Sequence, residues 1–297
     1  MLGYFHHKVR STPWLGRIVL KSIPDIKWHL QVEPVGRMAV RLREHRMFWL
    51  RPGLNHEGFM LGALQRLVRP GDEVWDIGAN IGLYSRVIVQ CFGAGHVVAF
   101  EPCARNRRLL EENVGVNGCR GKVSVMGCAI GDHDGYADFQ IDDLTSNTGT
   151  LDAVANGSAS QSRMQYGLPP AMTKVPIQRI DTLIEKERNP APDVVKIDVE
   201  GAEKMVLDGA DQLLAAHKPR LAVELHGADV ARQVLKKLWS CGYHCFGRIV
   251  IQEQMVYREI VADDLAAITA KQSLRYIAAS LNADELKEPI ADYRERK

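Results

Sequence analysis

The sequence predicts an α/β protein built on a doubly wound, mostly parallel sheet with helices on both faces. The first observation is the stretch 73–102, which has the pattern of a strand, a glycine turn, a helix and a second strand ending in Glu101. The second is the stretch 193–227, in which a further strand, helix and strand follow one another. The third is the alternation of strand and helix patterns along the chain, which is typical of parallel sheets.

Composition sets the limits of this prediction. The chain has 297 residues, of which 46% are apolar and 25% are charged, as in ordinary soluble proteins. It has no run of 18 apolar residues and no good secretion signal, so we expect no membrane span and a cytoplasmic protein. The six cysteines form no C-x-x-C pair, which favours reduced thiols, and we expect Cys91 and Cys128 in the core.

The charge is uneven although the net charge is +2. Residues 1–51 contain ten Lys/Arg against three acids, and the remainder is acidic. A basic arm of this kind either contacts an anionic partner or is a solvated face. The alternation over 36–50 predicts antiparallel strands, and 57–68 has helical spacing up to the stop at Pro70-Gly71. We interpret residues 1–70 as an N-terminal cap.

The stretch 73–102 carries the first chemistry. Strand 74–77 leads into the turn Gly78–Gly82, where glycines let the backbone approach a ligand closely. A helix follows with Leu83, Val87, Ile88 and Cys91 on one face, and strand 96–100 ends at Glu101. At that end a carboxylate can accept hydrogen bonds from ribose hydroxyls. Asp76, two residues before the first glycine, would repel a pyrophosphate and suits the ammonium of S-adenosylmethionine, whereas a dinucleotide site requires G-x-G-x-x-G.

The middle of the chain is predicted from spacing and turn residues. We expect a helix over 104–116, a strand over 122–130, and a hairpin turn at Asp134-Gly135 that joins Ile130 to strand 136–141. The polar stretch 142–170 is expected to be a lid-like insert or disordered. A strand is expected over 174–183.

The second half completes seven strands. We expect strands over 194–199, 221–225, 243–250, 251–257 and 274–280, with helices over 202–216 and 228–240. Inside the first helix, Met205, Val206, Leu207, Leu213 and Leu214 should face the core. The main domain is then 71–285, and 286–297 is a charged C-terminal tail.

Six segments together resemble the FkbM-type family of S-adenosylmethionine-dependent methyltransferases: DIGANIGLYS (76–85), FEP (100–102), NVGVNG (113–118), AIGD (129–132), KIDVEGAE (196–203) and AVELH (222–226). The resemblance covers roughly residues 55 to 280. It implies a class I methyltransferase (Rossmann-like) fold of seven strands with the last one antiparallel. It also implies O-methylation, often of a hydroxyl on a sugar or on a secondary metabolite of the polyketide type.

The resemblance also implies cofactor contacts at matching positions. Asp76, Gly78, Ala79, Asn80 and Gly82 match the first cofactor motif and would bind S-adenosylmethionine. The ribose acid is Glu101, followed by Pro102. Adenine would be flanked by Ile130 and Asp132, and Asp198 would lie beside the methionine moiety.

Catalysis requires a group that takes the proton of the acceptor hydroxyl. Strand ends at the carboxyl edge converge, so Asp198, Glu200, Glu224 and His226 should lie close together. We choose His226 as the base because its ordinary pKa is ~6.5, with Asp198 and Glu224 beside it, although a structural histidine explains the position equally well. The same four residues could hold Mg²⁺, which we do not favour. Glu203 is expected to cap a helix and Lys196 to be structural.

Other functions remain open at this point. A nicotinamide-dependent oxidoreductase is disfavoured by the missing third glycine and by Asp76, and a non-catalytic nucleotide-binding module by the intact loop. Nucleic-acid binding is disfavoured because the basic arm lacks clustered aromatic residues. The acceptor is expected to be a small molecule or a glycan, but no motif names it, and the oligomeric state is equally open.

Overall fold

The computed structural model describes residues 24–46, 48, 57–116, 118–141, 149–152, 169, 171–187, 189–251, 254–268 and 274–293. The start of the basic arm, most of the polar stretch expected to form a lid, and the last four residues of the expected tail lie outside this range.

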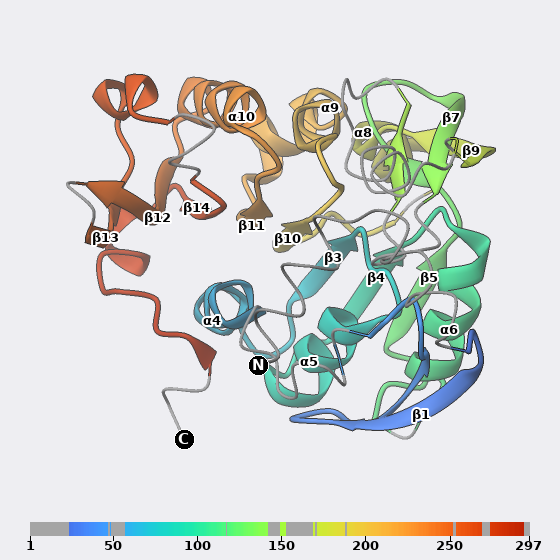
Figure 1. Cartoon of the computed structure of the whole chain (residues 1–297). Helices are drawn as coiled ribbons and strands as arrows, with labels where there is room; N and C mark the ends of the chain where they lie inside the picture. Colours follow the sequence, from blue (N-terminus) through green and yellow to red (C-terminus); the bar gives the residue numbers. More distant parts are fainter. Residues whose placement is uncertain are drawn as a thin grey trace.

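A central sheet organises the molecule (Figure 1). Five parallel strands form its body, and β14 lies antiparallel between β11 and β12. This confirms the mostly parallel class I arrangement with the last strand antiparallel. The count is eight rather than seven because β13 adds an antiparallel edge strand to β12. In spatial order the strands are β13 (Gln254–Glu259), β12 (His244–Ile251), β14 (Tyr276–Ser280), β11 (Arg220–Glu224), β10 (Val194–Ile197), β3 (Glu73–Ile77), β4 (His96–Phe100) and β5 (Val123–Met126).

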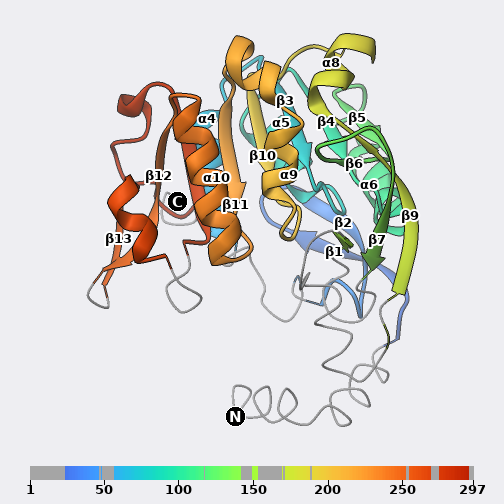
Figure 2. The ribbon, with the colours of Figure 1, turned by 90° about the horizontal axis from the view of Figure 1, so that it is seen from above.

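Helices cover both faces of this sheet (Figures 1 and 2). One face carries α4 (Gly58–Leu67), α5 (Leu83–Cys91) and α6 (Ala104–Val114), and the other carries α8 (Ile180–Glu187), α9 (Glu203–Asp208) and α10 (Ala228–Ser240). The strands are apolar on both sides, so each face has its own core. Val74 belongs to the core under α4 and α5, and the adjacent Trp75 belongs to the core under α9 and α10.

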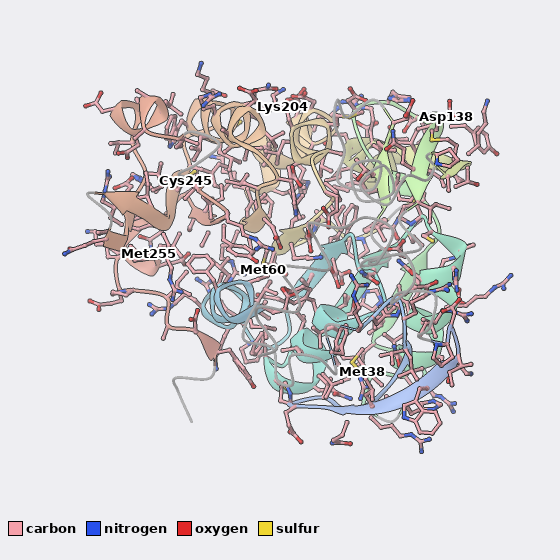
Figure 3. The ribbon with its side chains drawn as sticks, in the orientation of Figure 1. Met38, Met60, Asp138, Lys204, Cys245 and Met255 are labelled. Carbon is pink, nitrogen blue, oxygen red and sulfur yellow. The ribbon has the colours of Figure 1, made fainter. Side chains whose placement is uncertain are left out.

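The N-terminal and C-terminal segments complete the first of these cores. An antiparallel hairpin, β1 (Lys27–Val32) and β2 (Gly36–Arg41), lies against α6 (Figure 1). Met38 of the hairpin and Met60 of α4 are fully buried, whereas Met255 on the edge strand β13 is 66% exposed (Figure 3). Leu286 and Ile290, from the expected charged tail, are buried in the same core as α4.

A smaller sheet corrects three predictions about the middle of the chain. Its order is β6 (Ala129–Ile130), β9 (Ala171–Gln178), β7 (Gly135–Ile141) and β8 (Gly149–Leu151). The expected strand 122–130 therefore divides between two sheets. The expected hairpin at Asp134-Gly135 is wrong, because β9 lies between β6 and β7 and pairs with β7 over seven residues. The expected strand 174–183 ends at Gln178, and Leu183 lies in α8.

Three further expectations change. The predicted helix 202–216 is two pieces, α9 and the π-helical turn η2 (Leu213–His217), and Met205 is only half-buried. The break comes at Gly209, which packs directly against Gly131: a Cβ there would lie 1.9 Å from the Gly131 backbone oxygen, so this close contact requires glycine. The polar stretch contains the short strand β8. Cys128 is buried as expected, but Cys91 is exposed.

Candidate active site

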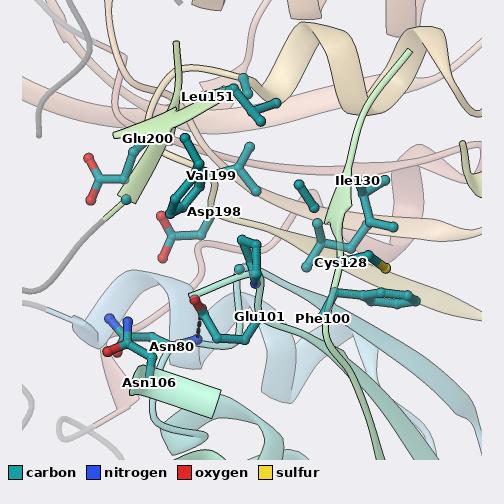
Figure 4. A pocket seen from close by; sticks show the side chains of 17 residues that line it. Asn80, Phe100, Glu101, Asn106, Cys128, Ile130, Leu151, Asp198, Val199 and Glu200 are labelled. Carbon is teal, nitrogen blue, oxygen red and sulfur yellow. Dashed lines mark hydrogen bonds between the residues drawn. The ribbon is translucent and has the colours of Figure 1, made fainter. Parts of the chain in front are cut away.

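A cavity opens at the carboxyl ends of β3, β4 and β10, with about 630 Å³ of empty space that is partly open to solvent (Figure 4). Its acidic lining residues are Glu101, Asp198 and Glu200. The side chains of Phe100, Ile130, Phe139 and Leu151 form apolar walls. Among the described residues that line the cavity there is no Lys, Arg or His.

The turn after β3 forms one edge of this cavity. The Gly78 and Ala79 amides donate to the backbone oxygen of Phe100 at 3.1 and 3.0 Å, which fixes the turn against β4. Gly78 has φ +79°, and a Cβ there would lie 1.8 Å from the backbone oxygen of Asp198, so only glycine fits. Asn80 also has a left-handed backbone (φ +51°), and Gly82 caps α5. Of these residues, Gly78 and Asn80 line the cavity.

Two backbone amides hold the carboxylate of Glu101. One carboxylate oxygen accepts the Asn80 amide at 2.9 Å (Figure 4). The other accepts the Cys103 amide, also at 2.9 Å. Burial raises the pKa of Glu101 to about 7, against the lowering effect of these two amides. Each oxygen keeps a further lone pair, so the carboxylate can still accept bonds from a ribose in the cavity.

Asp76 does not line the cavity. It is fully buried, accepts the Ser85 hydroxyl at 2.6 Å and pairs with the Lys196 ammonium at 3.1 Å. Lys196 also donates to the backbone oxygen of Gly78 at 2.8 Å. Burial tends to lower the pKa of Lys196, but the charges of Asp76 and Asp198 raise it. The Lys196 ammonium therefore neutralises the negative charge of Asp76.

The remaining expected cofactor residues divide into two groups. Pro102 and Ile130 line the cavity with Asp198. Ala79, Gly82 and Asp132 do not, and Asp132 is an exposed residue paired with His133 at 2.7 Å.

A histidine–carboxylate cluster lies beside the cavity, where β10 and β11 end. The Nδ1 atom of His226 lies 2.8 Å from Oε1 of Glu203. Its Nε2 atom faces three carboxylates, Glu224 and Glu200 at 3.5 Å and Asp198 at 3.9 Å. The structure therefore brings together all four residues that were expected to converge.

The surroundings of His226, Asp198 and Glu224 shift the pKa values of these three groups in different directions. Burial tends to lower the pKa of His226, but hydrogen bonds to Glu203 and Glu224 raise it well above its ordinary value. Burial raises the pKa of Asp198. Burial tends to raise that of Glu224 as well, but the His226 and Arg275 partners lower it. These neighbours therefore favour the protonated form of His226.

Several site residues were not found from the sequence. Glu203, which was expected only to cap α9, is fully buried and is the closest partner of His226 while it also accepts the Gly201 amide. Arg275, which directly precedes β14, binds Glu224 at 2.7 Å. Phe139 and Leu151 reach the cavity from the smaller sheet. The motif KIDVEGAE contained a signal for Glu203, but no local pattern indicated the other three.

The same cluster has a geometry that could hold a metal ion. Ligand atoms from Asp198, Glu224 and His226 lie within 4.8 Å of one another, which makes them a candidate group among the described residues. The Nδ1 atom of His226 is occupied by Glu203, so Nε2 is the atom left to face an ion, as in many carboxylate–histidine–metal sites.

Comparison with known proteins assigns the family. The profile of the Methyltransferase FkbM domain matches residues 76–245, more than half of the chain. The chain belongs to the FkbM methyltransferase family. It is therefore a methyltransferase, as the six motifs and the strand order of the central sheet indicate together.

Two curated proteins have sequences similar to that of this FkbM chain. It is 29% identical over 190 residues to the hexuronic acid methyltransferase AglP of Haloferax volcanii, covering 64% of this chain and 71% of that protein. It is 30% identical over 185 residues to the AMB antimetabolite synthetase AmbE of Pseudomonas aeruginosa. That match covers 54% of this chain and spans 9% of AmbE.

Solved structures give more distant likenesses. A methyltransferase FkbM from Methylobacillus flagellatus is 17% identical, with a TM-score of 0.44, covering 73% of this chain and 49% of that one. An S-adenosylmethionine-dependent O-methyltransferase from Thermotoga maritima is 14% identical, with a TM-score of 0.41, covering 90% and 80%. Within the described part of the FkbM chain, no helix is both long enough and apolar enough to span a bilayer.

Proposed function

We propose that this protein uses S-adenosylmethionine to O-methylate a hydroxyl on a sugar or on a secondary metabolite of the polyketide type. The observation that supports this is the charge of the cavity, which three carboxylates line without any cationic side chain among the described residues. Such a cavity disfavours the pyrophosphate of a nicotinamide dinucleotide. It suits a ligand that carries an ammonium and a sulfonium and no phosphate.

The residues present fit this cofactor. Glu101 would bind the ribose hydroxyls, because its carboxylate is fixed by two amides at the end of β4. Ile130, Phe139 and Leu151 would enclose the adenine between apolar walls. Asp198 would face the methionine end, and Asp76 would act indirectly, through Lys196 and the turn. When bound, S-adenosylmethionine supplies an electrophilic methyl group, and alignment is the main contribution of the protein.

We propose Asp198, rather than His226, as the group that takes the proton of the hydroxyl. His226 suits a base at its ordinary pKa, whereas its carboxylate partners raise that pKa and favour the protonated imidazole, which cannot take up a proton. Asp198 lines the cavity, exposes 23% of its side chain and has a raised pKa, as a general base near neutral pH requires. His226 would hold Glu203 and Glu224 in place and offset their charge.

A metal-assisted mechanism is the second candidate, because three ligand atoms cluster within 4.8 Å. Asp198, Glu224 and His226 would hold Mg²⁺, which lowers the pKa of a hydroxyl that it binds. Methyl transfer measured after EDTA treatment, with and without added Mg²⁺, separates the two mechanisms. Full activity in chelator would exclude the metal, and activity restored by Mg²⁺ would establish it.

The name of one relative suggests which class of acceptor to test first. AglP is named for hexuronic acid, so uronic acids and neutral sugars carrying free hydroxyls are the first acceptors to test. Incubation with a methyl-labelled donor and a panel of such glycans, followed by mass spectrometry of the products, would identify the acceptor.

Calorimetry tests the cofactor directly. We expect S-adenosylhomocysteine to bind the protein and NAD not to bind. Binding of NAD without binding of S-adenosylhomocysteine would instead favour the oxidoreductase that the same type of sheet could support. Binding of neither would contradict the proposed function.

A further inference from the structure

We propose that His45, in the N-terminal segment, is a positioning residue of the cofactor site that acts through Asn80. The inference rests on the proposed function, because it concerns the turn that would hold S-adenosylmethionine. His45 follows the hairpin β1–β2 and is 3% exposed. It lies outside residues 76–245, the region that matches the family profile.

The hydrogen bonds of His45 fix its tautomer. The Arg41 amide donates to Nδ1 at 3.0 Å, so Nδ1 carries no proton. Burial lowers the pKa of His45 to about 4, so the ring is neutral at pH 7 and its single proton is on Nε2. The ring therefore presents a donor at Nε2.

Asn80 provides the matching acceptor. Nε2 of His45 and Oδ1 of Asn80 are both buried, and neither atom makes a hydrogen bond in the structure among the described residues, which leaves a donor and an acceptor that could satisfy each other. The side chain of Asn80 interacts with His45. Asn80 lines the cavity, and its amide donates to Glu101, the expected ribose acid (Figure 4). His45 thus meets the turn at Asn80, the residue that links the turn to Glu101.

The segment that carries His45 is itself fixed to the cofactor half of the molecule. Asn113 of α6 pairs with the backbone of Ala39 through both of its amide atoms, at 2.7 and 3.0 Å, and also donates to the backbone oxygen of Ile81 at 2.8 Å. Arg86 of α5 donates to the backbone oxygen of Arg37 at 2.7 Å. Asn113 therefore holds the hairpin and the turn together, and Arg86 ties α5 to the hairpin, which lets His45 act on Asn80 from a fixed position.

This arrangement explains how Asn80 keeps an unusual backbone. A left-handed residue other than glycine is less stable than an extended or helical one unless its surroundings fix it. Here Glu101 holds the amide of Asn80 and Asn113 holds the next carbonyl, and on this proposal His45 would hold the Asn80 side chain. Removing His45 should leave the turn free to relax and should weaken cofactor binding without touching Asp198.

Calorimetric titration with S-adenosylhomocysteine tests the proposal. We expect His45→Ala to raise Kd about three- to tenfold, the scale of one lost buried hydrogen bond. His45→Gln, whose amide can donate toward Asn80, should restore most of the affinity. Trp28→Ala, at a 55% exposed position on the same hairpin, should bind like the wild type.

A double-mutant cycle shows whether the effect passes through Asn80. If it does, His45→Ala causes no further loss in an Asn80→Ala background. Equal losses in both backgrounds, or wild-type affinity in His45→Ala, would overturn the proposal. If His45→Ala does not fold, His45→Phe, which keeps a ring without nitrogens, is judged by the same two criteria. Absence of binding to the wild-type protein would instead contradict the proposed function itself.

Discussion

Glu101 shows how one side chain can serve both the fold and a ligand. Its two oxygens accept the amides of Asn80 and Cys103, so the carboxylate is fixed in the cavity at the end of β4. The sequence predicted this position because an acid follows the second strand. The two amide bonds, which decide its orientation, come from tertiary structure.

A change of Glu101 to Gln should weaken binding of S-adenosylhomocysteine by about tenfold or more. The amide nitrogen of Gln would face either a backbone N–H or a ribose hydroxyl, and one acceptor would be lost in each case. Calorimetry measures the change. Glu111→Gln, at an exposed position on α6, is the control and should bind normally. Equal affinity in Glu101→Gln would contradict a ribose-binding role.

The pH dependence of methyl transfer should follow Asp198. A base must be deprotonated, so kcat/KM should fall about tenfold per pH unit as the pH drops below the raised pKa of Asp198. We expect Asp198→Asn to remove most of the activity. His226→Gln should keep the acidic limb of the profile, although at a lower rate, because Glu203 and Glu224 lose their partner. Loss of that limb in His226→Gln would identify His226 as the base instead.

At the scale of elements, the close approach of two adjacent strand ends is the tightest constraint in the site. The turn after β3 passes so close to the residue after β10 that a Cβ on Gly78 would lie 1.8 Å from the Asp198 backbone oxygen. A periodic pattern along one strand cannot indicate such a contact. The glycine itself is visible in the sequence, but its closest neighbour is 120 residues away.

Gly78→Ala and Gly71→Ala separate two effects of replacing a glycine: the strain of a positive φ and the clash of the new Cβ with its neighbours. Both positions have positive φ, but nothing lies within 4 Å of a Cβ at Gly71. Gly71→Ala should therefore lower the free energy of unfolding by about 1 kcal/mol, and Gly78→Ala by clearly more, because the Asp198 backbone must also move. Urea denaturation measures the first quantity, and calorimetry should show loss of S-adenosylhomocysteine binding in Gly78→Ala alone. Equal stability of the two variants would show that the close contact is relieved without cost.

At the scale of the whole molecule, segments far apart in sequence share one core. The expected cap contributes β2 and α4, and the expected tail contributes Leu286 and Ile290, all packed in the core beneath α5. Arg248 donates to the backbone oxygen of Ile290 at 3.0 Å, which adds a polar link. The division at residues 70 and 285 stays a prediction, and the packing suggests a direct test of its second boundary.

A chain that ends at residue 285 should be less stable than one that ends at residue 293. The shorter chain loses the buried side chains of Leu286 and Ile290, and each loss should cost about 2–5 kcal/mol. The chain ending at 293 loses only residues outside the described range and serves as the control. Thermal and urea unfolding compare the two. Equal midpoints would show that 286–293 behaves as a tail after all.

Local patterns predicted most of the central sheet. Strand 96–100 and helix 228–240 have the predicted limits, since each has a clear apolar period and turn residues at its ends. The smaller sheet was predicted poorly. Turn chemistry at Asp134-Gly135 favoured a hairpin, but the longer pairing with β9, more than thirty residues away, is the one that forms.

By itself the sequence determined the family, the position of the glycine turn and the set of acids at the strand ends, because each depends on residue types at fixed local spacing. Only the tertiary structure decided what those groups can do. It paired Asp76 with Lys196, surrounded His226 with carboxylates, and placed His45 against Asn80. Protonation and orientation depend on burial and on neighbours from distant segments, and these are set when the chain folds.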